Sequence, residues 1–394
     1  MTLKKVVVTF DPGNTDIFRQ GFMRYNEETY VKDTYLFPEL KRLGVDVTIL
    51  EHEAGESSSD AAQRFGPVFE AADLIFHESR RVAYGVGAKE WRGEYAKGIE
   101  ELIQRDFLKK SHLIGSNGNP IAYKHNGSKL ASDAGALIPA QWNPSEYLAS
   151  DSPLPVVIKP VSMNGGSQIF FLDRAEQVAT IFDDEKYKNN AFFPPTDGFN
   201  IIQKFVETPS DHFTHYRIFT LGDGRIIGAV LHASSNKKSG LKRLAEPGPF
   251  DWGSHIYDNV KSPLYLGRFD IVSNVAQGGF QIPMNPNRES AFILGTDQRI
   301  LTAHNLDQYH PQLPDALAAQ ATNVAKAFRQ HGVVYGGQDW MQDKQGNFYF
   351  IEINEYPGMA IFNTLYSGGQ ETDAEFIAQN GAKHLARGLV EWSG

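Results

Sequence analysis

In the first third of the chain, short apolar runs alternate with segments whose apolar positions follow helical spacing. Short apolar runs predict strands, and helical spacing between them predicts helices. The predicted strands are 4–10, 45–50, 72–77 and 112–115, and the predicted helices are 38–43 and 97–109. Strands that alternate with helices are typical of a mainly parallel sheet, where ligands gather at the carboxyl ends of strands. We therefore predict an α/β N-terminal domain over residues 1–118.

From residue 119 the pattern changes to paired strands flanked by helices, which predicts an α+β architecture. Gly222-Asp223-Gly224 is a turn signal between two apolar runs and predicts a hairpin. The other segments are predicted from period and turn residues. The predicted strands are 155–159, 199–206, 215–221, 225–232, 291–295 and 299–303, and the predicted helices are 124–135, 174–182, 314–331 and 371–392.

A second hairpin is predicted in the C-terminal stretch GGQDWMQDKQGNFYFIEINEYPG, residues 336–358. Glu352 and Asn354 lie two apart on a strand and therefore share a face, and a short turn at DKQGN would place Asp339 opposite Glu352. Carboxylates that are buried together need a counter-charge. A hard divalent cation, Mg²⁺ or Mn²⁺, would supply it. The alternative is that these are ordinary polar residues on a solvent-exposed face.

Composition excludes several classes of function. The 394 residues are 41% hydrophobic and 22% charged, as in a soluble globular protein of two or three domains. A net charge of −9 argues against nucleic acid as a partner. The chain has no cysteine, which removes disulfides, thiolate nucleophiles and thiolate zinc sites. Without a secretory signal or an apolar run of about 18 residues, we expect a cytoplasmic protein with no membrane partner.

Several polar residues at strand ends could bind a nucleotide. Lys159 ends the strand PVVIK before a glycine-bearing loop, where a lysine and backbone N–H groups can hold a phosphate. The strand at IIQKFVETPSD offers its backbone edge to a base, with Asp211 or Glu207 for ribose, and Arg217 and Asn274 offer donors for phosphate. The alternatives are a plain tight turn and a strand arginine in a salt bridge. Neither a Walker P-loop nor GxGxxG is present.

The order and spacing of these motifs resemble the ATP-grasp superfamily over residues 129–358. The resemblance is strongest at VVIKP…NGGS, IIQKFVE…HYRIF, SNVAQGG and QDWM…FIEINEYPG. It implies an α/β N-terminal domain followed by two α+β subdomains that grip ATP, a lid at 119–206 and a catalytic subdomain at 207–394. Segments near 236–268 and 283–311 look like insertions. The closest types are carboxylate–amine ligases such as the glutamylating ligases, glutathione synthetase and D-alanine–D-alanine ligase.

The resemblance also implies roles for individual residues. Lys204 stands where acidic residues are common in the family, so adenine would be contacted there through the backbone only. The implied phosphate ligands are Lys129, Lys159 and the loop residues Ser162, Gly165, Gly166 and Ser167; the adenine and ribose ligands are Gln203, Lys204, Phe205, Val206 and Asp211; the metal ligands are Asp339, Glu352 and Asn354; and Arg217 and Asn274 would contact phosphates and the activated acyl group.

The implied activity is an ATP- and Mg²⁺-dependent carboxylate–amine ligase that forms an amide through an acyl phosphate and releases ADP and phosphate. Its partners would be a small acid and an amine, such as an amino acid or short peptide; a homodimer stays open. The alternatives are an ATP-grasp kinase and a nucleotide-binding protein without turnover. Structural roles are favoured for His215 and His232 over general-base roles. Four arginines are candidate carboxylate clamps for substrate, with surface salt bridges as the default interpretation: Arg80, Arg81, Arg243 and Arg288.

Overall fold

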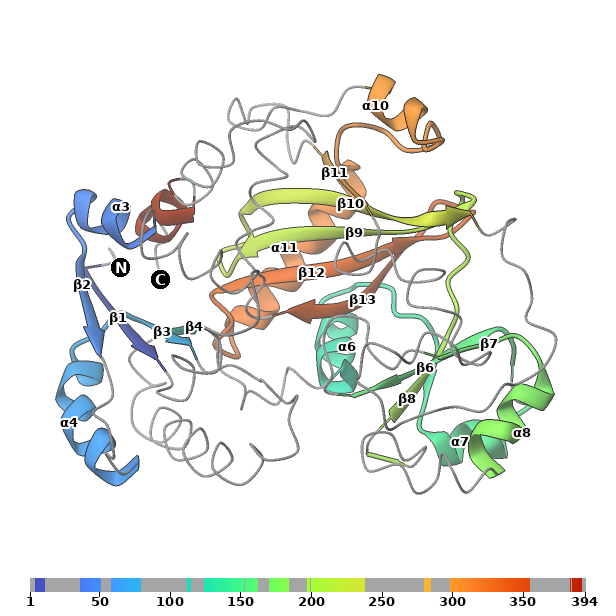
Figure 1. Ribbon diagram of the computed structural model, residues 1–394, viewed down its shortest axis with the longest axis horizontal. Helices are drawn as coiled ribbons and strands as arrows, with labels where there is room; N and C mark the ends of the chain where they lie inside the picture. Colours follow the sequence, from blue (N-terminus) through green and yellow to red (C-terminus); the bar gives the residue numbers. More distant parts are fainter. Residues whose placement is uncertain are drawn as a thin grey trace, which may run out of the picture.

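The computed structural model describes a little over half of the chain, in segments that include the strands of three sheets (Figure 1). All structural statements below refer to these segments. The described residues are 4–10, 36–50, 58–78, 112–114, 124–151, 153–161, 170–183, 197–198, 200–237, 280–284, 298–354, 383 and 385–391.

The N-terminal sheet is parallel, as the alternating pattern predicts. Its strand order is β2-β1-β3-β4, and each pairing between neighbours is parallel. Apolar β-branched residues at the centre of β1 suit a strand that is buried on both faces. The elements are β1 (Lys5–Phe10), α3 (Phe37–Arg42), β2 (Asp46–Leu50), α4 (Ser58–Glu70), β3 (Leu74–Glu78) and β4 (His112–Ile114).

A second sheet is antiparallel and has the order β5-β8-β6-β7. One face buries Val156, Ile158 and Ile202 with Tyr147 and Val178 of the helices α7 and α8. Alternation then places Val157, Lys159 and Gln203 on the opposite face. The elements are α6 (Lys124–Asp133), β5 (Gln141–Trp142), α7 (Pro144–Ala149), β6 (Val156–Pro160), β7 (Phe170–Leu172), α8 (Ala175–Asp183) and β8 (Asn200–Lys204).

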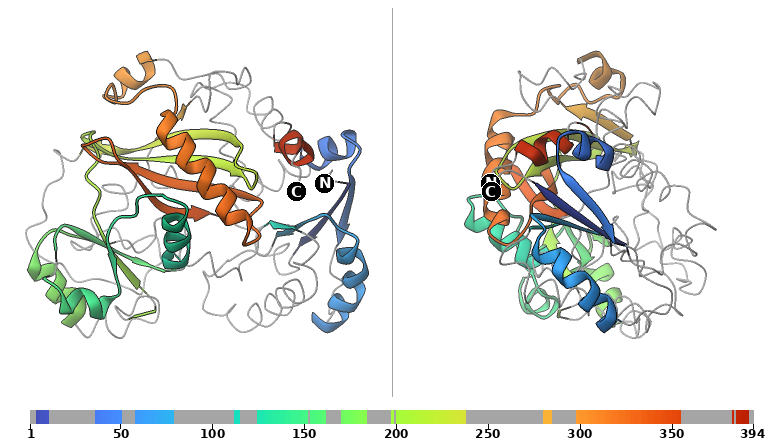
Figure 2. Two further views of the ribbon diagram at one scale, coloured as in Figure 1. Left: turned by 180° about the vertical axis from the view of Figure 1, so that it is seen from behind. Right: turned by 90° about the vertical axis from the view of Figure 1, so that its left-hand side faces the viewer.

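The third sheet is also antiparallel and has the order β11-β10-β9-β12-β13. Helix α11 crosses one of its faces, as the two views show (Figure 2), and buries Leu317, Val324 and Phe328 against Trp340 and Phe350. The elements are β9 (His212–Leu221), β10 (Ile226–Lys237), β11 (Phe280–Met284), α10 (Gln298–Ala303), α11 (Asp315–Arg329), β12 (Tyr335–Gln342) and β13 (Phe348–Asn354).

The prediction of a strand at 299–303 is wrong, because this segment forms the helix α10. Its single buried side chain, Leu301, is followed by a reversal in which Leu306 N–H donates to Leu301 O at 2.8 Å. Asn305, at φ 57°, ends the helix in the left-handed region that asparagine tolerates. A run this short has too few positions to distinguish the two periods.

One core joins the first sheet to the third. Leu36 and Leu40 from the N-terminal region cluster with Phe219 and Leu221 of β9, and helical residues 385–391 contribute Leu389 to the same cluster. No described helix is long and apolar enough to cross a membrane.

Candidate functional site

Three charged side chains lie in a row across neighbouring strands of the third sheet. Arg217 on β9 is the register partner of Asp339 on β12, and Asp339 is the partner of Glu352 on β13. Register partners project from the same face of a sheet. The prediction that Asp339 lies opposite Glu352 is therefore confirmed. Arg217 forms a bidentate salt bridge with Asp339, in which Nε donates to Oδ1 at 2.7 Å and Nη2 donates to Oδ2 at 2.6 Å.

Two lysines from outside this sheet, on α6 and on β6 of the second sheet, reach this row. Lys124, at the start of α6, places Nζ 3.2 Å from Oε2 of Glu352. Lys159 lies on β6, on the face of the second sheet opposite Val156 and Ile158, and is buried. The charges of Glu352 and Asp339 act on it. Lys159 was predicted here, whereas Lys124 was not.

Burial and the neighbouring charges shift the pKa values of Lys159 and Glu352 strongly. Burial lowers the pKa of Lys159 to about 8, although the neighbouring Glu352 opposes the shift. Burial would raise the pKa of Glu352, but Lys124, Lys159 and Arg217 outweigh it and lower that pKa to about 2. At neutral pH the three cations and two carboxylates leave one net positive charge. The cluster is therefore built to receive an anion.

The sequence argument that a divalent cation must neutralise the carboxylates needs correction. Arg217 and Lys124 already supply the counter-charge. Within the described part of the chain no three His, Cys, Asp or Glu residues are grouped to hold a metal ion. Two carboxylates do nevertheless fit Mg²⁺, which takes few protein ligands and completes its shell with phosphate oxygens and water. Asn354, two residues along the same face of β13, is a further oxygen donor.

His215 and His232 lie beside this row as a stacked pair, with ring centroids 4.5 Å apart and planes 7° apart. Burial lowers the pKa of His215 to about 4, although Asp339, 3.9 Å away, opposes the shift. His215 is therefore neutral at pH 7 and a weak base. The structural role favoured for His215 stays a prediction.

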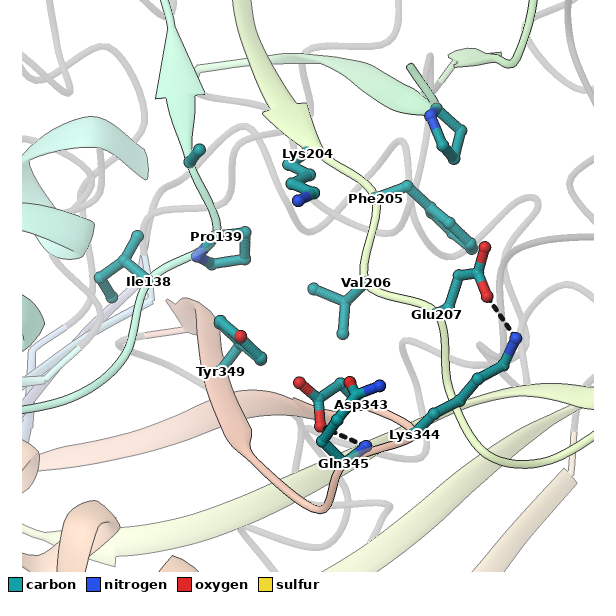
Figure 3. A pocket seen from close by; sticks show the side chains of 12 residues that line it. Ile138, Pro139, Lys204, Phe205, Val206, Glu207, Asp343, Lys344, Gln345 and Tyr349 are labelled. Carbon is teal, nitrogen blue, oxygen red and sulfur yellow. Dashed lines mark hydrogen bonds and ion pairs between the residues drawn. The ribbon is translucent and has the colours of Figure 1, made fainter. Parts of the chain in front are cut away.

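A cavity of about 510 Å³ lies at the hinge where the chain leaves β8 for β9 (Figure 3). Its walls are residues 138–140, Pro155, residues 204–207, residues 343–345 and Tyr349. Val206 and Tyr349 point into it, and Glu207 forms an ion pair with Lys344 at its rim. A volume of this size suits a small ligand.

Two polar groups of the hinge are left for a ligand. Lys204 N–H donates to Ala140 O at 2.8 Å, and Phe205 N–H donates to Pro155 O at 3.1 Å. Val206 is buried and makes no hydrogen bond within the described segments. The amide Nε2 of Gln203 is also buried without a partner there. Buried donors are rarely left unpaired, so both indicate a binding site.

Solved structures match this arrangement, while neither a protein-family model nor a curated protein sequence matches the chain. The macrocyclase MdnC bound with precursor peptide MdnA, from Microcystis aeruginosa MRC, is similar at a TM-score of 0.50 and 12% identity, covering 98% of this chain and 100% of that chain. The ATP-grasp ligase PsnB complexed with minimal precursor gives 0.48 and 14%, covering 98% of each chain. The L-amino acid ligase from Bacillus licheniformis gives 0.46 and 13%, covering 97% and 75%.

The chain shares the fold of MdnC. Structures of ATP-grasp ligases are among those to which it is similar, in line with the resemblance inferred from the sequence. In this chain the second sheet, the hinge and the third sheet surround the charged row and the cavity.

The lysine predicted on α6 has to be corrected. Lys129 is exposed and pairs with Asp133 at 2.6 Å, whereas Lys124 is buried against Glu352. Five residues on a helix correspond to about 140° of rotation, so the two lysines cannot both face the site. The sequence did hold the signal: Lys124, Gly127, Ser128 and Ala131 form the buried stripe at i, i+3, i+4 and i+7.

The remaining predicted residues divide into two groups. Asp211 is exposed just before β9 and does not line the cavity, whereas Glu207 does, so the ribose ligand stays open between them. The others lie outside the described residues, and their roles stay predictions: Ser162, Gly165, Gly166, Ser167, Asn274, Arg80, Arg81, Arg243 and Arg288.

Proposed function

We propose that the protein is an ATP- and Mg²⁺-dependent carboxylate–amine ligase. The observation that carries the proposal is the junction of two features: a net-positive row of buried charges and a hinge cavity beside it. The cavity borders Pro155 and Tyr349, and the charges include Lys159 and Glu352 on the same two chain segments. Three to four residues of strand span about 10–13 Å, which suits a base at one end and phosphates at the other.

The base would be adenine, held by the hinge. Val206 N–H can donate to a ring nitrogen of the base, and the Gln203 amide can hydrogen-bond to the edge of the base. Ile138, Pro139 and Val206 would pack on its faces. Lys204 and Phe205 would act only through their backbone carbonyls, because the Lys204 side chain is exposed, Phe205 packs on Phe213, and both N–H groups already donate to Ala140 O and Pro155 O.

The phosphates would lie against Lys124, Lys159 and Arg217, whose charges can spread over the non-bridging oxygens. Asp339, Glu352 and Asn354 would hold Mg²⁺, which supplies neutralisation of the charge that develops during phosphoryl transfer. Lys159 is protonated at pH 7, since its pKa is about 8.

The chemistry would proceed in two steps. The γ-phosphoryl group moves from ATP to a substrate carboxylate, breaking the bond to the leaving ADP oxygen and forming an acyl phosphate. An amine then attacks the acyl carbon, forms the C–N bond, loses a proton and expels phosphate. Positioned charge is the main requirement of such a transfer, and no protein nucleophile is needed. The absence of cysteine is consistent with this chemistry.

The substrates would be an amino acid or peptide carboxylate and an amine. MdnC, which shares the fold, is a macrocyclase bound with a precursor peptide, so peptides belong among the acids to be tested. The test is ADP release from ATP and Mg²⁺ against pooled amino acids and dipeptides, each with and without a second amine. A ligase consumes ATP only when both acid and amine are present, and the product gains the mass of the acid and amine minus water.

Two alternatives give different results in the same assay. A kinase would release ADP without an amine and yield a phosphorylated product. A nucleotide-binding protein without turnover would bind ADP in calorimetry and hydrolyse nothing with any pool. Absence of adenine-nucleotide binding under all conditions would contradict the proposal.

A further inference from the structure

We infer that Lys124 and Arg217 make this site selective for a metal–nucleotide complex and closed to free divalent metal ions. The inference rests on the proposed nucleotide site and adds which form of the metal ion, free or nucleotide-bound, that site accepts. It starts from the finding that the carboxylates already have cationic partners.

Both oxygens of Asp339 are engaged by Arg217, at 2.7 and 2.6 Å. Glu352 is engaged by Lys124 at 3.2 Å and is flanked by Lys159. The exposed fractions of the side chains are 9% for Asp339, 19% for Arg217 and 7% for Lys124. A metal ion that arrived alone would have to displace partners that are largely withdrawn from water.

Displacement would leave the cations stranded. Three cations against two carboxylates give a net charge of +1, and a bare Mg²⁺ or Mn²⁺ would raise it to +3. A buried charge that loses its partner is strongly unfavourable. The row therefore repels a free divalent ion, even though its carboxylates are chemically suited to bind one.

A polyphosphate changes this balance. Its oxygens can form ion pairs with Lys124, Lys159 and Arg217. Asp339 and Glu352 are then free to coordinate the metal. Each ligand then favours the other, and the factor is reciprocal by linkage. We expect ADP to tighten Mn²⁺ binding, and Mn²⁺ to tighten ADP binding, by at least about 100-fold after correction for Mn–ADP formation in solution.

The experiment follows free Mn²⁺ by electron paramagnetic resonance and ADP by calorimetry on the full chain. Wild type should bind no Mn²⁺ at submillimolar concentration without ADP and should bind it when ADP is present. Lys124→Met should acquire Mn²⁺ binding without ADP, because Glu352 loses its partner. Lys124→Met combined with Glu352→Gln should lose that acquired binding.

Lys129→Met is the matched control, because Lys129 lies on the same helix but is exposed and paired with Asp133. It should behave as wild type. Lys124→Arg should restore the exclusion of free Mn²⁺. Arg217→Met provides a second route, since it frees Asp339, and it replaces Lys124→Met if circular dichroism shows that the latter fails to fold.

Two outcomes would overturn the inference. One is Mn²⁺ binding to wild type without ADP that Glu352→Gln abolishes. The other is a folded Lys124→Met or Arg217→Met variant that still requires ADP for Mn²⁺. Either leaves the proposed ligase standing if ATP is consumed, whereas loss of the proposed function would show as no ADP binding with or without metal.

Discussion

Glu352 is the point where three cations converge, and their charges lower its pKa to about 2. We expect Glu352→Gln to lower turnover by ~10²-fold or more, the scale of removing one preorganised electrostatic group. The amide keeps the shape but cannot neutralise Lys124 or hold Mg²⁺ as a carboxylate does. Steady-state ADP release at saturating Mg²⁺ measures the effect. Asp133→Asn, an exposed carboxylate on α6, should leave turnover unchanged; wild-type turnover in Glu352→Gln would contradict the assignment.

Lys159 makes nucleotide affinity dependent on pH. Burial lowers its pKa to about 8 in the free protein, and a bound phosphate would raise that pKa again. Below pH 8 Lys159 is protonated in both the free and the nucleotide-bound protein, so the affinity for nucleotide does not change with pH. Above pH 8 the free protein loses this proton and binding must take it up again, so the affinity falls by up to about tenfold per pH unit. Calorimetry with MgADP between pH 7 and about 9.5 measures the slope. Lys159→Arg should flatten it, since guanidinium stays charged, and an equal slope in that variant would assign the effect elsewhere.

At the scale of elements, the hairpins follow from local rules. Alternation and a short turn place Asp339 opposite Glu352, and both signals lie within the segment itself. Which lysine of α6 faces the site depends on helical phase, and the small residues Gly127 and Ser128 fix that phase. One wall of the hinge cavity, residues 204–206, is predicted from the sequence as a base-binding strand, whereas the other walls could not be predicted because they come from segments far apart in sequence, such as 138–140 and 343–345.

The predicted β9–β10 turn offers a matched pair of glycine substitutions. Gly224 has φ +93°, and an added Cβ would lie 2.8 Å from Thr322 Cγ2 and from Lys326 Cε on α11. Gly346, in the β12–β13 turn, has φ +88° and only Gln342 Nε2 at 4.0 Å. Both alanine variants share the left-handed strain, and only Gly224→Ala adds a clash between turn and helix.

We expect Gly346→Ala to lower the free energy of unfolding by about 1–2 kcal/mol and Gly224→Ala by about 2–5 kcal/mol. Urea denaturation measures both. Equal losses in the two variants would show that the contact between the β9–β10 turn and α11 relaxes without cost.

At the scale of the whole molecule, the sequence predicts an N-terminal domain that ends near residue 118, yet its sheet shares a core with the third sheet. Leu40 of α3 clusters with Phe219 of β9 and Leu389 of the C-terminal helical segment. These segments come from both ends and the middle of the chain (Figure 1). No local period encodes such packing. The shared core ties the sheet that carries Arg217 to the N-terminal sheet.

Leu40→Ala tests whether the two units unfold together. Leu40 is fully buried, so we expect a loss of about 2–5 kcal/mol in unfolding free energy. Because the core is shared, hydrogen exchange should accelerate in β9 as well as in β1. Leu148→Ala on α7, where the leucine is 50% exposed, should change neither. If hydrogen exchange accelerated in β1 but stayed at the wild-type rate in β9, the N-terminal sheet would unfold as an independent unit. The stability of the strand that carries Arg217 would then not depend on that sheet.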